Sequence, residues 1–456
     1  MTCPAPWRKA TGTGRRAQRR AGEPMIGKER RCSGANSCSS RPRRGAGHRP
    51  GDQRRPQPRP PELREDHGYN RLSPSRRRAG IAAARTPIPL RRPPRPVATC
   101  GMPLTTHHSP LTKEKSPMSV CLGFIGTGGI ARRHLTNCKD HPDVEIVGQC
   151  DVVLERAQAA ATEFGGNAYQ SAEDLYDKEK PDAVVLCTPP FAHGDLEEGA
   201  ARRGIHFFVE KPVAIDMAMA NRVQRVVEET GITTQVGYMF RLAEGPKKAR
   251  ELLATRAVAM VQAHYYMPGL PGPSWWPKMA LGGGQLVEQA THMLDLGRFL
   301  AGDVKSVTGR TARVRDWTPP AGYEPAPGLL KYADGFEIPD TTGLVMEYES
   351  GALGTLSCSM VPQAAWDNGF KVVADGLLVT LEGATARWVG DEEGNLPAGA
   401  NWANYVLDEF IAAVKDGTGK TSVPYIEGVK SLAVSLAGYE SVKRGGGPVE
   451  IAELVD

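Results

Sequence analysis

Several features that would assign a chain to other protein classes are absent from this sequence. No apolar run approaches the roughly 20 residues that a membrane-spanning helix needs, and no apolar stretch of useful length follows the N-terminal arginines, which argues against a secretory signal. The nine cysteines form no C-x-x-C pair and show no spacing typical of a disulfide framework. Because cysteines stay reduced in the cytoplasm, this usage predicts a cytoplasmic protein with no membrane partner.

Acidic residues are scarce in the first 117 positions, which hold 27 Lys and Arg against 7 Asp and Glu. Residues 118–456 hold 30 against 44, so the net charge of +6 averages two opposite parts of the chain. The first part is rich in Arg, Pro, Gly, Ala and Ser and has no apolar periodicity, so it cannot bury enough surface to offset its chain entropy. This composition predicts a disordered basic extension over residues 1–117.

Three interpretations of this extension compete. Arginine clusters attract phosphate, as in a nucleic-acid-binding arm, and Arg-rich, acid-poor leaders also target proteins to compartments. The third interpretation is an overlong start, because translated GC-rich upstream DNA has the same bias towards Arg, Pro, Gly and Ala. We favour the third interpretation, since Met118 lies two residues before the first apolar run, and we expect no nucleic-acid partner.

A short apolar run over residues 120–125 breaks into glycines and leads towards a helix. The turn reads Gly126, Thr127, Gly128, Gly129, Ile130 and Ala131. It fits the pattern G-x-G-x-x-G/A, in which the first glycine permits a tight turn, the second lets the backbone approach phosphate and the small last residue lets helix and strand pack closely. Free N–H groups at the helix start then hold the anion, so the pattern predicts a pyrophosphate site.

The next strand, over residues 144–150, ends at Asp151, twenty positions after Ala131. A carboxylate there can accept hydrogen bonds from the ribose hydroxyls of NAD and would repel the 2′-phosphate of NADP. Asp151 could instead cap the helix that begins near Val153, and both roles can coexist. The residue favours NAD as the cofactor, while the nearby Arg156 leaves NADP open.

Strand and helix signals continue to alternate along the first folded part. Two buried strands end at polar residues or prolines, namely Thr188, Pro189, Glu210 and Lys211. Repeated βα units imply a doubly wound parallel sheet whose ligand site lies at the carboxyl ends of the strands. We therefore expect these four residues to lie at the cofactor.

Four motifs follow one another along the chain. They are the glycine turn, Thr188-Pro189-Pro190 with His193, Glu210-Lys211-Pro212, and the segment from Gly282-Gly283-Gly284 to Asp295. Together they resemble the glucose–fructose oxidoreductase, inositol dehydrogenase and MocA family, from about Met118 to the C-terminus. The resemblance implies a Rossmann domain over residues 118–239 and, over residues 240–456, an α/β domain with a large, mostly antiparallel sheet.

The same resemblance implies a function. It indicates an NAD-dependent oxidoreductase that transfers hydride between a sugar, cyclitol or similar polyol and the nicotinamide, and a homo-oligomer that packs through the C-terminal sheet. Two alternatives stay open. Some relatives oxidise a sugar transiently and act as redox-neutral glycoside hydrolases, whereas a non-catalytic nucleotide-binding regulator should tolerate the loss of Lys211 and His292.

Hydride transfer from an alcohol carbon requires removal of the hydroxyl proton, and a positive charge helps as the alkoxide develops. Lys211 suits both tasks, and by resemblance it lies where nicotinamide and substrate meet. Glu288 and His292 are spaced i, i+4, so on a helix they share one face, where His292 could relay a proton or bind a hydroxyl. By resemblance the position of Glu288 is commonly an aspartate that contacts substrate. No third ligand is evident near this pair, and we expect no metal.

Other candidates for the site are individually weaker. His193 could contact the cofactor or serve as a structural loop residue, and Asp295 could orient His292 or stabilise the fold. The residues that could line the substrate cleft are Tyr238, Arg241, Trp275, Trp276 and Asp295. Aromatic rings there could stack on a sugar, although core packing is their general role. Residues 268–273 are typical of a loop or lid.

Overall fold

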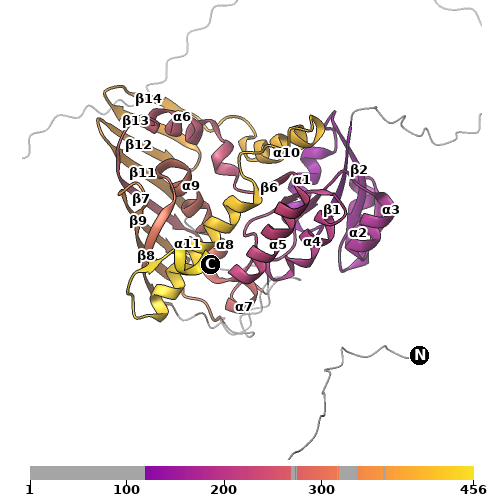
Figure 1. Cartoon of the computed structure of the whole chain (residues 1–456), viewed down its shortest axis with the longest axis horizontal. Coiled ribbons are helices and arrows are strands. Elements are labelled where there is room, and N and C mark those ends of the chain that lie inside the picture. The colour runs from indigo at the N-terminus through magenta and orange to yellow at the C-terminus, as the bar shows by residue number, and fades with distance from the viewer. Residues whose placement is uncertain are drawn as a thin grey trace, which may run out of the picture. The chain divides into compact units, whose positions relative to one another are not determined.

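The computed structural model describes residues 119–268, 273, 275–315, 317, 336–362 and 366–455. The predicted extension over residues 1–117, the predicted start at Met118 and most of the predicted loop over 268–273 lie outside these residues. Within them the chain forms two sheets, each flanked by helices (Figure 1).

The first sheet is parallel throughout and, among the described residues, has six strands in the order β3-β2-β1-β4-β5-β6. These are β1 (Val120–Ile125), β2 (Val144–Cys150), β3 (Asn167–Tyr169), β4 (Ala183–Leu186), β5 (His206–Val209) and β6 (Thr234–Val236). The helices between them are α1 (Gly129–Cys138), α2 (Leu154–Phe164), α3 (Ala172–Glu179), α4 (Asp195–Ala201) and α5 (Met217–Thr230). Every residue of β1 and β4 is buried, and because successive side chains point to opposite faces, both faces of the sheet are covered.

The second sheet is mostly antiparallel and, in the same described ranges, has nine strands in the order β14-β13-β12-β11-β7-β10-β9-β8-β15. These are β7 (Val258–Tyr266), β8 (Val304–Ala312), β9 (Thr341–Tyr348), β10 (Leu353–Ser359), β11 (Asp367–Ala374), β12 (Leu377–Glu382), β13 (Thr385–Gly390), β14 (Gly394–Leu396) and β15 (Val449–Glu450). Among the described strands of this second sheet, β7 and β10 are the only neighbours that run parallel. Burial alternates along β9 and β12, so one face packs on the core and the other faces outwards.

Helices cover the inner face of this second sheet, with α6, α9 and α11 lying against it in Figure 1. The helices of this part are α6 (Glu244–Leu253), α7 (Met279–Gly282), α8 (Gly284–Glu288), α9 (Thr291–Ala301), α10 (Tyr405–Lys415), α11 (Tyr425–Lys443) and α12 (Ala452–Val455). In the described ranges no helix has the length and apolar character needed to cross a membrane.

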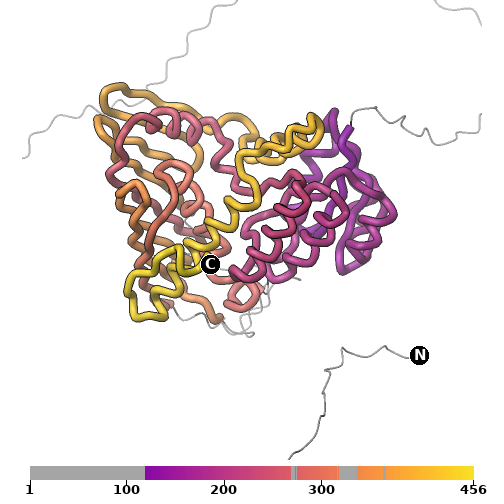
Figure 2. The backbone as a smooth tube through the Cα atoms, in the orientation of Figure 1, coloured from indigo at the N-terminus to yellow at the C-terminus, as the bar shows by residue number. Residues whose placement is uncertain are grey.

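The C-terminal segment links the two sheets. Helix α10 packs against β1, β5 and β6 of the first sheet, and the chain then runs back through α11 to the second sheet, as the yellow end of the tube in Figure 2 shows. Between these helices the carbonyl of Val423 accepts a hydrogen bond of 2.9 Å from the N–H of Val236 in β6. The side-chain amide of Gln235 donates to the carbonyl of Val406 at 3.1 Å. The Val423 bond pairs a backbone N–H at the outer edge of β6, which would otherwise be open.

The predicted fold class is confirmed. A doubly wound parallel sheet precedes a large, mostly antiparallel one. The parallel strands bring the ends of β1, β2, β4 and β5 to one edge of the sheet, and the predicted cofactor residues follow these ends.

Candidate active site

The glycine turn joins β1 to α1. Gly126 has a φ of +80°, and a Cβ there would lie 2.6 Å from the carbonyl oxygen of Cys187. Only glycine fits this position without moving backbone. A Cβ on Gly128, the N-cap of α1, would meet nothing within 4 Å. The turn therefore combines a sterically fixed corner with an open helix N-terminus, as a site for an anion requires.

Asp151, which follows β2, is hydrogen-bonded to the glycine turn. Its Oδ2 accepts hydrogen bonds from the backbone N–H and the hydroxyl of Thr127, both at 3.1 Å, and its Oδ1 accepts one from the N–H of Val153 at 3.0 Å. Val153 is the N-cap of α2, so the carboxylate also supports the start of that helix. Because a carboxylate has about four acceptor positions, Asp151 keeps acceptor capacity for a ribose hydroxyl.

Thr188 follows β4 and lies beside the glycine turn. Its methyl group would be 3.2 Å from a Cβ on Gly126. The Thr188 hydroxyl is buried, and none of the described residues gives its oxygen a hydrogen-bond partner. A buried hydroxyl without a partner is costly, so this group suits a ligand that brings polar atoms of its own. Together with the open Gly128, it makes this edge of the sheet a fit for NAD.

His193 precedes Gly194, the N-cap of α4. Its Nδ1 is hydrogen-bonded to Glu197, and both side chains are buried. The other oxygen of Glu197 accepts the N–H of Gly194 at 2.6 Å. This arrangement favours the structural interpretation of His193, and a contact with the cofactor stays a prediction.

Lys211 follows β5 and reaches the end of α8. Its Nζ donates hydrogen bonds to the carbonyl oxygen of Glu288 at 2.9 Å and to Glu288 Oε1 at 3.1 Å. An ammonium has three donors, so one N–H is left for a ligand. The structure thus brings together two of the three residues that the sequence predicted as catalytic.

The second carboxylate oxygen of Glu288 is held by two other side chains. Trp276 donates its indole N–H to Oε2 at 3.0 Å, and the side-chain amide of Gln289 donates to the same oxygen. Glu288 is 9% exposed and Trp276 is 6% exposed. The ring of the neighbouring Trp275 packs against Gly282 instead. The sequence predicted Trp276 as a surface for sugar stacking, and the structure adds that its polar edge is directed at Glu288.

Glu210, the residue before Lys211, is paired with α1. His134 Nε2 lies 2.7 Å from Glu210 Oε1, and Arg133 Nη2 lies 3.8 Å from the same oxygen. Glu210 Oε2 accepts the backbone N–H of Lys211 at 3.3 Å. Burial raises the pKa of Glu210, but His134, Lys211 and Arg133 oppose burial and lower this pKa to about 2. Sequence reasoning missed His134, whose only signal is a place on α1 three residues after Ala131.

His292 is a buried residue of α9. The rings of Tyr238 and Phe240 contact its imidazole edge-on, with centroids 6.0 and 5.6 Å away, and the Tyr238 hydroxyl is hydrogen-bonded to Thr291 at 2.7 Å. Burial, and then the positive charge of Lys211, lower the pKa of His292 to about 3. Its Nδ1 has no hydrogen-bond partner within the described part of the chain. The imidazole is therefore neutral at neutral pH, and one buried ring nitrogen is unpaired within these residues.

The prediction that Glu288 and His292 share one continuous helix is wrong. Helix α8 ends at Glu288 and α9 begins at Thr291. At the junction the N–H of Ala290 bonds back five residues to the carbonyl of Gln285 at 2.9 Å, which widens the turn. The described residues also contain no group of three His, Cys, Asp or Glu side chains that could hold a metal ion.

Arg241 and Asp295 form a buried ion pair with each other. Arg241 donates from Nε at 2.8 Å and from Nη2 at 2.7 Å to the two oxygens of Asp295, and the side chains are 5% and 1% exposed. Arg241 also donates to Glu427 at 3.1 Å, and Asp295 accepts the hydroxyl of Ser431 at 3.0 Å. Because these bonds occupy the polar atoms, the geometry favours the structural role that the sequence left open for Asp295.

The glycine run before α8 serves close packing. Gly283 and Gly284 have φ values of +71° and +79°, and a Cβ on Gly284 would lie 2.4 Å from the hydroxyl oxygen of Tyr439. That oxygen accepts the N–H of Leu286 at 3.1 Å. The absence of side chains therefore lets this turn pack closely on Tyr439.

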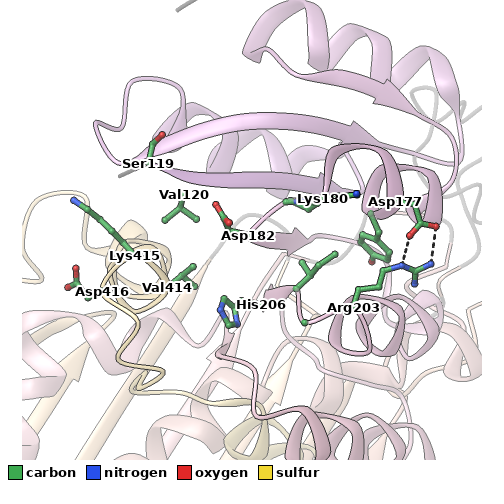
Figure 3. A pocket seen from close by; sticks show the side chains of 14 residues that line it. Ser119, Val120, Asp177, Lys180, Asp182, Arg203, His206, Val414, Lys415 and Asp416 are labelled. Carbon is green, nitrogen blue, oxygen red and sulfur yellow. Dashed lines mark hydrogen bonds and ion pairs between the residues drawn. The ribbon is translucent and has the colours of Figure 1, made fainter. Parts of the chain in front are cut away.

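A separate pocket of about 860 Å³ lies at the opposite edge of the first sheet. Figure 3 shows Val120, Asp182 and His206, at or next to the amino ends of β1, β4 and β5, together with Lys415 from the end of α10. Lys211 and the glycine turn follow the carboxyl ends of the strands, so this pocket is not part of the candidate active site.

Two family models match the chain. A model described as an oxidoreductase family with an NAD-binding Rossmann fold matches residues 120–238, and a model of the GFO/IDH/MocA C-terminal domain matches residues 247–376. Together these ranges cover more than half of the chain.

Curated relatives and solved structures are similar over much of the chain. D-apiose dehydrogenase of Paraburkholderia graminis is 26% identical over 350 residues, which cover 70% of this chain and 87% of that protein. Myo-inositol 2-dehydrogenase of Thermotoga maritima is 23% identical over 337 residues, covering 71% and 95%. A Schizosaccharomyces pombe protein is 30% identical over 234 residues, but the match spans 48% of this chain and 57% of that protein. The crystal structure of the WlbA dehydrogenase from Bordetella pertussis, in complex with NADH and UDP-GlcNAcA, has the same fold, with a TM-score of 0.61 at 23% identity over 73% of this chain and 98% of that one.

Proposed function

The chain belongs to the oxidoreductase family with an NAD-binding Rossmann fold, and we propose that it transfers hydride between a hydroxyl of a sugar, cyclitol or similar polyol and NAD. Residues 118–239 bind the cofactor in this proposal, and residues 240–456 form the substrate domain. The relatives named for D-apiose and myo-inositol support this class of substrate. The observation that carries the proposal is the buried contact of Lys211 with Glu288, with His292 in the field of the same ammonium.

Each of these three side chains has a distinct task in the reaction. When bound, NAD accepts a hydride from the alcohol carbon. Lys211 uses its remaining N–H to hold the substrate oxygen and to stabilise the negative charge that develops on it. His292, which is neutral at neutral pH, has a ring nitrogen that is unpaired among the described residues and can hold the substrate hydroxyl or relay its proton. Glu288 holds the Lys211 ammonium in place through Oε1.

The cofactor residues follow from the geometry of the strand ends. The open backbone from Gly126 to Ile130 suits the pyrophosphate, because α1 begins there with free N–H groups. The remaining acceptor capacity of Asp151 suits the ribose. Thr188 and Pro189 lie between the glycine turn and Lys211 in the order of the strands, which suits the nicotinamide end.

A second copy of the chain is proposed to pack on the outer face of the second sheet. Five apolar side chains lie directly opposite one another on adjacent strands there: Val389, Leu378, Val373, Met260 and Leu353. Each is between 41 and 51% exposed. Such a row across β13, β12, β11, β7 and β10 is a contiguous apolar surface of the kind that oligomers bury.

The proposed location is the cytoplasm. The five cysteines among the described residues are all buried, and such thiols suit a reducing compartment.

The proposal is tested by following nicotinamide reduction with NAD or NADP across a panel of inositols, aldoses and sugar derivatives. Formation of NADH with at least one polyol is the expected result. The reverse assay, oxidation of NADH by the corresponding ketones, covers an unfavourable equilibrium. Protein that binds NAD tightly but gives no turnover in either direction across both panels would contradict the proposed function.

A further inference from the structure

The Glu288 carboxylate is held by side chains from three separate parts of the chain. Lys211 comes from the end of β5, Trp276 from the segment between β7 and α7, and Gln289 from the junction of α8 and α9. The ammonium of Lys211 donates a hydrogen bond to Oε1 at 3.1 Å, and the indole N–H of Trp276 donates one to Oε2 at 3.0 Å. Both oxygens are thus fixed by donors, and the carboxylate has little freedom to turn.

A second line of support reaches the same carboxylate from the sheet. The hydroxyl of Tyr265, in β7, donates to the side-chain oxygen of Gln289 at 3.3 Å, and the amide of Gln289 donates to Glu288 Oε2. Burial, and then the negative charge of Glu288, raise the pKa of Tyr265 above its usual range, so the phenol stays protonated and remains a donor. The network is buried, where charge-assisted hydrogen bonds are strong.

Glutamate needs such support more than aspartate would. Its side chain has one more rotatable bond, so a carboxylate held only by Lys211 would populate several rotamers. Each rotamer would change the bond from the ammonium to Oε1, whereas the bond to the backbone carbonyl of Glu288 does not depend on the side chain. The indole N–H of Trp276 selects the rotamer in which the ion pair forms.

We propose that Trp276 is a positioning residue of this enzyme, and that its indole N–H fixes Glu288 and thereby the ammonium of Lys211. This inference rests on the proposed function, because it assigns Trp276 a part in keeping Lys211 where the substrate oxygen is held. It differs from sugar stacking, since the polar edge of the indole is used and not the ring face.

The test compares Trp276→Phe with Trp388→Phe. The first variant keeps an aromatic ring and loses the N–H that Glu288 accepts, while the second loses an indole N–H in β13 that has no hydrogen-bond partner among the described residues. With a polyol that the wild type oxidises, Trp276→Phe should lower kcat by about 100-fold, the size of effect that a small misplacement of a reacting group causes. Trp388→Phe should stay near the wild-type kcat, and both variants should keep wild-type affinity for NAD.

A double-mutant cycle separates positioning from simple packing. In a Glu288→Gln background, Trp276→Phe should have little further effect on kcat, because the carboxylate that the indole fixes is already gone. Independent and multiplicative losses of kcat in the double variant would overturn the inference.

A readout that needs no turnover completes the test. Acylation of the Lys211 amine, followed by peptide mass spectrometry, should be several-fold faster in Trp276→Phe than in Trp388→Phe, because an amine reacts only after it leaves its carboxylate partner and loses its proton. Equal labelling in the two variants would overturn the role of Trp276 even if the wild type turned over no polyol. A labelling difference without any turnover would leave the positioning intact and count against the proposed function.

Discussion

The imidazole of His292 is the side chain whose burial has the clearest consequence for pH. Burial and the Lys211 cation lower its pKa to about 3, from the ordinary value of 6.5. Below about pH 6.5 the unfolded chain therefore binds a proton that the folded chain does not. As the pH is lowered from about 6.5 towards 3, the free energy of unfolding should therefore decrease. This group contributes at most about 1.4 kcal/mol per pH unit to the decrease.

Urea unfolding between pH 7 and pH 4 measures this effect. The wild type should lose stability with falling pH more steeply than His292→Gln, which removes the titrating group and keeps a polar side chain of similar reach. If both proteins lost stability with the same slope, the neutral, buried state of His292 would be contradicted.

In the glycine turn, the fold requires glycine at position 126, whereas only a bound ligand would require it at position 128. A Cβ at position 126 would meet the Cys187 carbonyl at 2.6 Å with φ at +80°, whereas a Cβ at position 128 would meet nothing within 4 Å. We expect Gly126→Ala to lower both the unfolding temperature and NAD affinity. Gly128→Ala should unfold like the wild type and still bind NAD more weakly, because only the ligand comes close to that position.

Thermal unfolding and calorimetric titration with NAD check the two glycine variants side by side, with Gly129→Ala as a further comparison in open space. Wild-type NAD affinity in Gly128→Ala would show that the pyrophosphate does not lie against this turn.

The elements that carry the site differ in how far their sequence reveals them. Lys211 and the glycine turn could be placed in advance, because buried apolar runs mark parallel strands and their carboxyl ends meet at one edge. The junction between α8 and α9 could not, since neither glycine nor proline stands between Glu288 and His292 to mark a break. Long-range partners were equally hidden. His134 meets Glu210 across 76 positions, and no local pattern encodes such a pair.

The same limit applies to Arg241 and Asp295. Their types and spacing are compatible with a substrate cleft, and only the fold shows that Glu427 and Ser431, more than 130 positions away from either of them, complete their hydrogen bonds. Helix α11 supplies both partners, and a helix that returns from the far end of the chain gives no signal near residue 241.

For the assembled protein, the apolar row on the outer face of the second sheet predicts an oligomer that a single charge should disrupt. Val373 lies in the middle of the row, between Leu378 and Met260 on the adjacent strands. Val373→Glu should shift the sedimentation coefficient to that of a monomer, because a buried carboxylate without a partner is costly. Val152→Glu, at a position 81% exposed beside the first sheet, is the matched control. A monomeric wild type, or an unchanged oligomer in Val373→Glu, would contradict this packing.

The central claim is that Lys211 acts at the reacting hydroxyl, and Lys211→Met tests it most directly. Lys248→Met, which breaks only the partly exposed pair with Glu251, is the control. Initial rates of NAD reduction with an accepted polyol, measured beside calorimetric titration with NAD, should show a loss of kcat/KM of about 1,000-fold in Lys211→Met with NAD affinity largely retained. Equal rates in the two lysine variants would contradict the account.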